Sequence, residues 1–560
     1  MGRISLDSYD QIQEERTAVG SIYFPAGEYR RRNKAFREYN YDVLLTANKK
    51  LSENFSARGA LGVNIRKTTQ RGISAKTNGG LSVPKIYVLT NSKNPIEAPL
   101  ESDYYVNKQV NGFFADAGIG YKEFLFLDGS FRRDIASSLP KGNNAYNYGQ
   151  VSTSFVFSKF LENNPVLTFG KVRASYAEVG SDAPFNALTD QYFKPTPFGA
   201  TTLFSVPAVK NNSALVPERT KSYEVGVEAN FFDGRVGFDV TYFNSETVDQ
   251  IIPVSVSSST GYDSKYVNAG TLVNKGLEAT LTATPIKKGA FTWDVSLNWT
   301  RIRNEVTELF GDVKNLTLSS YFTASGSLNA PLGGSYGTIM GTDYVYTNGE
   351  RTINATTGRY QRTTTVTNPI GSINPDWTGG IQNTLTYKDL SLSFLVDAKY
   401  GGDVLSIDMY YGLAVGLYEE TAGLNELGNP VRSAVSEGGG VLLKGVNPDG
   451  TVNQTRLNML AYPQMGTQTT GPTARYIYDA SYVKLREVLL TYNLPSSLMA
   501  RLSPLRQVSI SAVGRNLWII YKNLPYADPE DNVGAGNIQG IQSGALPAVR
   551  TIGFNVKATF

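Results

Sequence analysis

Alternation of apolar and polar side chains over long stretches is the feature that most constrains how this chain can fold, and it is clearest at the C-terminus. Every second residue of the last ten is apolar: Ile552, Phe554, Val556, Ala558 and Phe560. A β-strand directs successive side chains to opposite faces, so residues 551–560 predict a strand with one apolar and one polar face. A soluble sheet and the closing strand of an outer-membrane barrel both fit one such strand.

The same alternation returns along the chain in about fifteen stretches of roughly 10–14 residues, which is longer than ordinary soluble strands. Short and long connections take turns between these stretches. Asp233-Gly234 is a typical short one, because Asp-Gly between two alternating runs favours a hairpin turn. The long connections include 66–107, 180–218, 305–376, 402–478 and 520–548.

Short turns on one rim and long loops on the other are typical of a transmembrane β-barrel. The predicted fold class is therefore all-β: part of an antiparallel transmembrane barrel, with about 15 long strands, short periplasmic turns and long extracellular loops. The alternative is a soluble all-β protein such as a propeller. A propeller would show a fixed blade period, whereas these loops vary several-fold in length.

Composition removes several classes of function. The chain has no run of about 18 apolar residues, so it offers no transmembrane helix. Its net charge of +4 is too small to indicate nucleic-acid binding. Cysteine and histidine are both absent, which removes disulfides, thiolate nucleophiles and the usual general base. Gly333-Gly334-Ser335-Tyr336-Gly337 matches a G-x-S-x-G elbow, but that elbow needs a histidine, so we expect no catalytic residue, no cofactor-binding residue and no enzyme.

We expect two regions in the chain. Residues 1–37 are polar and irregular, with a basic cluster at residues 30–37, and are predicted to be the remnant of an extracellular loop. Residues 38–560 are predicted to be the barrel portion. Near the C-terminus, Asp528, Glu530 and Asp531 form an oxygen-rich group in a predicted extracellular loop that could hold Ca²⁺. A solvated Asp-Pro turn is the alternative.

A series of short motifs follows one another in a fixed order along the chain. They are Gly120-Tyr121-Lys122, Arg132-Arg133-Asp134, Gly170-Lys171-Val172-Arg173, Asn268-Ala269-Gly270, Asn374-Pro375-Asp376-Trp377, Ser481-Tyr482-Val483-Lys484-Leu485-Arg486-Glu487 and Gly514-Arg515-Asn516-Leu517. Their order and spacing across residues 38–560 resemble the C-terminal part of the SusC/RagA family of TonB-dependent outer-membrane transporters of Bacteroidetes.

This resemblance implies nutrient import across the outer membrane. Members of the family form large single-chain barrels, and 22-stranded transporters of this kind carry a plugged lumen. A SusD-like surface lipoprotein lids the barrel and captures glycans or peptides, and TonB supplies energy through the plug. Loop aromatics would then stack on sugars or contact the lid: Tyr321, Phe322, Tyr410 and Tyr411. Packing within the loops is the alternative role for these side chains.

The chain departs from the family pattern at its N-terminal side. We expect the plug, the TonB box, a signal peptide and some seven strands to be absent from it, and the piece to be incomplete as a transporter on its own. Two other functions stay open from the sequence. One is an outer-membrane adhesion or surface-binding barrel without transport, and the other is a soluble all-β carbohydrate-active protein.

Overall fold

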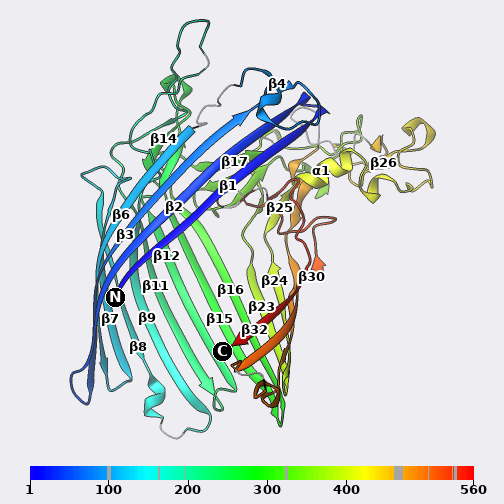
Figure 1. Ribbon diagram of the computed structural model, residues 1–560. Helices are drawn as coiled ribbons and strands as arrows, with labels where there is room; N and C mark the ends of the chain where they lie inside the picture. Colours follow the sequence, from blue (N-terminus) through cyan, green and yellow to red (C-terminus); the bar gives the residue numbers. More distant parts are fainter. Residues whose placement is uncertain are drawn as a thin grey trace. The chain divides into compact units, whose positions relative to one another are not determined.

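One long antiparallel meander dominates the structure. The computed structural model describes residues 1–96, 103–161, 164–195, 197–321, 326–459, 471–501, 504–532, 534, 536 and 539–560. Figure 1 shows the long strands side by side, with each strand next to its neighbour in sequence. No helix within these described ranges is both long enough and apolar enough to cross a bilayer.

The main sheet has sixteen strands, and their order in space is their order in sequence. They are β1 (Gly2–Ser21), β2 (Phe24–Lys50), β3 (Phe55–Lys76), β6 (Asp103–Tyr121), β7 (Leu125–Ala136), β8 (Ala145–Phe155), β9 (Leu167–Ser181), β11 (Glu218–Phe231), β12 (Val236–Val248), β15 (Thr271–Lys288), β16 (Phe291–Glu308), β23 (Trp377–Tyr387), β24 (Leu390–Tyr400), β29 (Tyr482–Asn493), β30 (Gln507–Lys522) and β32 (Thr551–Thr559). The order begins with β1 and ends with β32, so these two strands are its edges.

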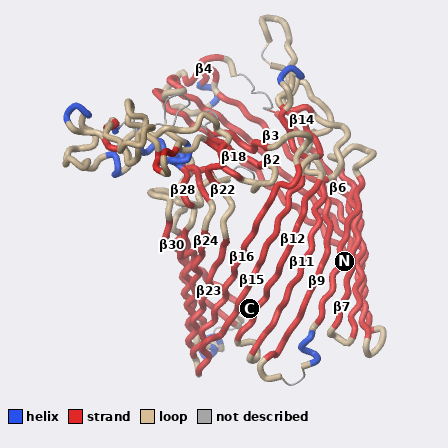
Figure 2. Tube along the Cα trace, turned by 180° about the vertical axis from the view of Figure 1, so that it is seen from behind, coloured by secondary structure: helices blue, strands red, loops and turns tan. Residues whose placement is uncertain are grey.

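The predicted alternation of short and long connections is confirmed from β9 onward, whereas the connections β1–β2 and β2–β3 are both short. The β11–β12 turn places Asp233 and Gly234 at φ angles of 56° and 79°, the left-handed conformation that an Asp-Gly hairpin requires. Similarly short turns join β6 to β7, β15 to β16 and β23 to β24. The long connections carry small sheets and helices of their own, which Figure 2 draws as short red and blue segments within the tan loops.

By their internal contacts, the residues divide into two units. The first comprises Met1–Val156, Arg173–Tyr223 and Ser245–Thr271, and the second comprises Phe157–Val172, Glu224–Asn244 and Leu272–Phe560. In the first unit, one face of the sheet carries exposed apolar side chains and the other carries rows of polar side chains that bond from strand to strand.

One polar row in the first unit shows how that face is held. Arg3 of β1 donates to Asp42 of β2 at 2.9 and 2.7 Å, and Asn64 of β3 donates to the other carboxylate oxygen of Asp42 at 2.7 Å. On the opposite face Leu45 and Leu61 face each other across β2 and β3 and are 69% and 60% exposed. An apolar face this open belongs against lipid, and a bonded polar face belongs against water.

The prediction of a loop over residues 1–37 is wrong, because these residues form β1 and the first half of β2. Ile4, Leu6 and Ile12 share one face of β1, but Asp10, Glu14 and Arg16 on that face interrupt the alternation that indicates a strand. Ion pairs take the place of apolar contacts: Glu15 and Arg30 are register partners with a 3.3 Å ion pair, and Tyr29 donates to Glu14 at 2.6 Å. Counting β1 raises the sheet from about fifteen strands to sixteen.

Adjacent residues on β2 test the assignment of the two faces. Leu45→Arg places a cation on the apolar face and is expected to lower the free energy of unfolding in lipid vesicles by about 2–4 kcal/mol. Thr46→Arg, on the polar face, is expected to change it by less than about 1 kcal/mol. Guanidinium unfolding of both variants measures the difference. Equal losses in the two variants would contradict the assignment.

Candidate functional site

Long loops of the second unit fold together into a packed platform. Three short strands from two loops form one sheet, in which β25 (Asp403–Ser406) lies between β28 (Ile477–Asp479) and β31 (Ile541–Gln542). The helix α1 (Ile407–Ala414) follows β25 directly. Together these elements bury one apolar core: Val404, Leu405, Ile407, Met409, Leu413, Tyr476, Ala480, Leu524 and Ile541.

Polar contacts join the start of α1 to the last loop. The Ser406 hydroxyl caps the helix by accepting from the Met409 amide at 3.1 Å, and it donates to the side-chain carbonyl of Gln542. The Gln542 amide in turn donates to Asp408, whose other carboxylate oxygen accepts from the Gly544 amide at 2.7 Å. The loops at 401–481 and 523–550 therefore hold each other in place.

The loop aromatics singled out from the sequence have different environments. Tyr321 and Tyr410 are half-buried against the apolar core, which fits the alternative of loop packing. Tyr411 is 55% exposed, with its ring 5.0 Å from that of Tyr410. Phe322 lies outside the described residues. A contact of these side chains with a ligand or a lid stays a prediction.

A run of exposed apolar side chains begins within α1 and continues past its end, and we call it the apolar loop stretch. Its members are 55–74% exposed: Tyr411, Val415, Leu417, Leu424 and Leu427. Beside it, Tyr418 and Tyr526 stack with parallel rings 4.2 Å apart. The sequence did not reveal this stretch. Its apolar residues do not alternate as in a strand, and such residues can equally be buried inside a folded loop. Several large apolar side chains exposed within one segment, 411–427, make it a candidate interaction surface.

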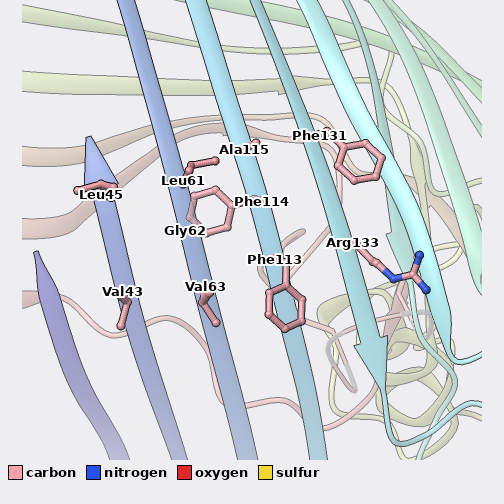
Figure 3. A pocket seen from close by; sticks show the side chains of 10 residues that line it. All are labelled: Val43, Leu45, Leu61, Gly62, Val63, Phe113, Phe114, Ala115, Phe131 and Arg133. Atoms are coloured by element: carbon pink, nitrogen blue, oxygen red, sulfur yellow. The ribbon is translucent and has the colours of Figure 1, made fainter. Parts of the chain in front are cut away.

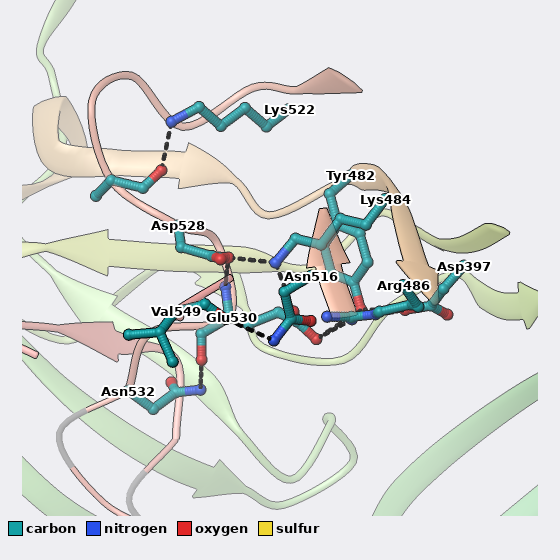
Figure 4. Close-up of polar contacts among 11 residues, drawn as sticks. Asp397, Tyr482, Lys484, Arg486, Asn516, Lys522, Asp528, Glu530, Asn532 and Val549 are labelled. Atoms are coloured by element: carbon teal, nitrogen blue, oxygen red, sulfur yellow. Dashed lines mark hydrogen bonds and ion pairs between the residues drawn. The ribbon is translucent and has the colours of Figure 1, made fainter. Parts of the chain in front are cut away.

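A cluster of five charged residues ties the last loop to the sheet, and we call it the Lys484 cluster (Figure 4). It contains Asp397 of β24, Lys484 and Arg486 of β29, and Asp528 and Glu530 of the loop at 523–550. The Lys484 ammonium lies 2.5 Å from both Asp528 and Glu530. Arg486 donates to Glu530 at 2.5 Å and to Asp397 at 2.7 Å.

Burial makes this cluster a strong constraint on the loop. The side chains of Lys484 and Asp528 are only 5% and 6% exposed. Burial raises the pKa of the Glu530 carboxyl, but hydrogen bonds from Arg486 and Lys484 outweigh that effect and lower the pKa to about 2. Glu530 is therefore ionised at neutral pH, and the loop keeps its charge pairs.

Two of the three predicted calcium ligands, Asp528 and Glu530, pair with Lys484. Asp528 and Glu530 direct their carboxylates at the ammonium group, and the Asp531 amide donates to the Asp528 carbonyl at 3.0 Å. Across the described ranges, no group of three or more acidic side chains is placed to hold a metal ion. A lysine from a distant strand supplies the positive charge beside these carboxylates, and nothing in the structure supports calcium.

Removing the central cation is expected to free the loop. Lys484→Met leaves Asp528 buried without its cation, a change that costs about 3–5 kcal/mol in comparable pairs. Amide hydrogen exchange at 526–532 is expected to speed up by at least about a hundredfold. Lys522→Met is the matched control, because Lys522 donates to the uncharged Ala527 carbonyl, at 2.6 Å, and forms no ion pair among the described residues. Equal exchange in both variants would show that the cluster does not hold the loop.

Acid is expected to weaken the same contact. Because the pKa of Glu530 falls from 4.5 to about 2 on folding, its contribution to stability is full above pH 4.5 and is lost as the pH falls through about 2. The wild-type protein should melt at a higher temperature than Glu530→Gln at pH 6. The two melting temperatures should converge by pH 2. A difference in melting temperature that stays the same from pH 6 to pH 2 would contradict the lowered pKa of Glu530.

Comparison with known proteins identifies the family. Residues 4–423 match the family model described as TonB dependent receptor-like, beta-barrel. TonB-dependent receptor P3 of Formosa agariphila is 26% identical over 566 residues, covering 95% of this chain and 53% of that protein. TonB-dependent receptor SusC of Bacteroides thetaiotaomicron is 27% identical over 233 residues, covering 39% of this chain and 23% of that protein.

Solved structures agree on the fold. The structure of the RagAB peptide transporter superposes with a TM-score of 0.75 at 18% identity, covering 100% of this chain and 60% of the other. The chain spans about half the length of the curated receptors that match most of it, 53% for receptors P3 and P26 of Formosa agariphila. The chain belongs to the TonB-dependent receptor β-barrel family and is of the SusC/RagA type.

Proposed function

We propose that this chain forms part of an outer-membrane nutrient importer that TonB energises. The observation that carries the proposal is the sixteen-stranded meander with its apolar face, in a chain that matches the receptor barrel over residues 4–423. Similar proteins are named as receptors and transporters, which favours import over catalysis and over adhesion. The chain's own part in this function is to supply the wall and the outer loops.

The edges of the sheet indicate what else an importer needs. β1 and β32 each have one neighbour in the main sheet. An edge strand presents unpaired backbone groups, which hydrocarbon does not tolerate. We therefore propose that further strands and a plug, to which TonB attaches, complete the working transporter.

The proposed substrate class rests on the family resemblance. RagAB is described as a peptide transporter, and SusC is the receptor that shares 27% identity with part of this chain. We propose a peptide or an oligosaccharide as the cargo. Deleting the gene and comparing uptake of labelled peptides and oligosaccharides, with and without a protonophore, tests this. Energy-dependent uptake lost in the deletion supports import, and unchanged uptake of both classes overturns it.

The apolar loop stretch is the proposed contact for a SusD-like surface lipoprotein. Tyr411 and Leu417 are 55% and 73% exposed and lie on the platform that the loops build. Covering such side chains removes apolar surface from water, which favours association.

A double variant tests this contact. Tyr411→Ser with Leu417→Ser is expected to reduce co-purification of the lipoprotein with the full-length transporter by at least about tenfold, since two interface anchors are lost. Val452→Ser is the matched control, because Val452 is 67% exposed in the same long loop but outside the stretch. If the double variant recovers as much lipoprotein as the wild-type protein, the lipoprotein does not bind at the apolar loop stretch.

A further inference from the structure

The apolar face of the first unit has a hollow with a volume of about 410 Å³ (Figure 3). Most of its lining comes from side chains that share this face on four neighbouring strands: Val43, Leu45, Leu61, Val63, Phe113, Ala115, Phe131 and Arg133. Small residues make the hollow. Ala115 lies in register between Leu61 and Phe131, so a methyl group stands where its neighbours carry large side chains.

Arg133 is the one cation in this lining. Its register row runs Val43, Val63, Phe113 and Arg133, so it continues an apolar row. Its guanidinium donates to the Asn147 side chain at 3.4 Å, and no carboxylate pairs with it within the described ranges. The preceding residue, Arg132, faces the polar side and pairs with Asp134 at 2.8 Å. Arg133 therefore keeps an uncompensated charge on an apolar surface.

The position of Arg133 along β7 is near one edge of the apolar band, where a long side chain can extend its charged end to the headgroups. It lies eight residues beyond Leu125, where β7 begins, which corresponds to about 26 Å along a strand. Barrel strands tilt by about 35–45°, so this length spans about 20 Å of height, and the apolar band is about 25 Å tall. On the side of Arg133 toward the long loops, the same face carries the stacked pair Tyr39 and Tyr41, with rings 6.3 Å apart. Aromatic pairs of this kind mark the interface between hydrocarbon and headgroups.

We propose that this hollow is a binding site for one anionic lipid, with an acyl chain in the hollow and the lipid phosphate at Arg133. Charge selects the occupant, since a guanidinium at headgroup depth pairs with phosphate and is repelled by a cationic group. The proposal rests on the transmembrane orientation of the sheet and is independent of what the transporter carries.

Lipid retention by the purified full-length protein tests the site. The probes are phosphatidylglycerol and phosphatidylethanolamine with identical acyl chains, and native mass spectrometry counts the bound lipid. The wild-type protein should retain phosphatidylglycerol about fivefold better, the ratio that one arginine near the membrane surface provides. Arg133→Gln should abolish this preference. Ala115→Phe, which fills the hollow, should reduce the retention of both lipids.

Lys67→Gln is the matched control for charge. Lys67 lies on the same face of β3, pairs in register with Tyr39 and Gln109, and does not line the hollow. It should leave the preference unchanged. Equal retention of the two lipids by the wild-type protein, or equal effects of Arg133→Gln and Lys67→Gln, would overturn the proposal. Lipid retention is measured independently of substrate uptake. A negative result would therefore reject the lipid site without affecting the proposal of import.

Discussion

Pairing of backbone groups is the constraint on which the rest of this structure depends. Hydrocarbon offers no partner for a peptide N–H or C=O, so a chain that crosses it with strands must bond each strand to its neighbours. The meander does this for every inner strand of the main sheet and leaves β1 and β32 as edges. Side-chain alternation follows from the same geometry, because one face of each strand meets lipid and the other meets water.

The long loops lie outside the hydrocarbon, so their backbone groups can also bond to water and the loops can fold as a soluble protein does. Those of the second unit bury their own apolar core around β25 and α1. The Lys484 cluster then fastens the last loop to β29 through a charge pair that is nearly excluded from water. A fixed platform of this kind presents the apolar loop stretch in one arrangement, which is what recognition of a partner by a preorganised surface requires.

Sequence predicted those parts of the fold in which local pattern and tertiary environment agree. The strand at 551–560 and the Asp233-Gly234 turn are such cases, because alternation and turn chemistry are properties of adjacent residues. Residues 1–37 are the opposite case, since their strands are held by cross-strand ion pairs that appear only once the register is known. Asp528 and Glu530 suggested calcium because their cation, Lys484, lies more than forty residues away in the chain. The lipid-facing hollow could not be predicted from the sequence either, because its lining comes from four strands whose register is known only from the structure.

A transmembrane sheet places its short turns and its long loops on opposite sides of the outer membrane. The chain has no cysteine, so a single introduced thiol reports its own position. We predict that, in intact cells making the full-length protein, a membrane-impermeant maleimide labels Val452→Cys in a long loop. Lys288→Cys, at the β15–β16 turn, should react only after the outer membrane is permeabilised. Labelling of Lys288→Cys in intact cells to the same extent as Val452→Cys would contradict the transmembrane assignment.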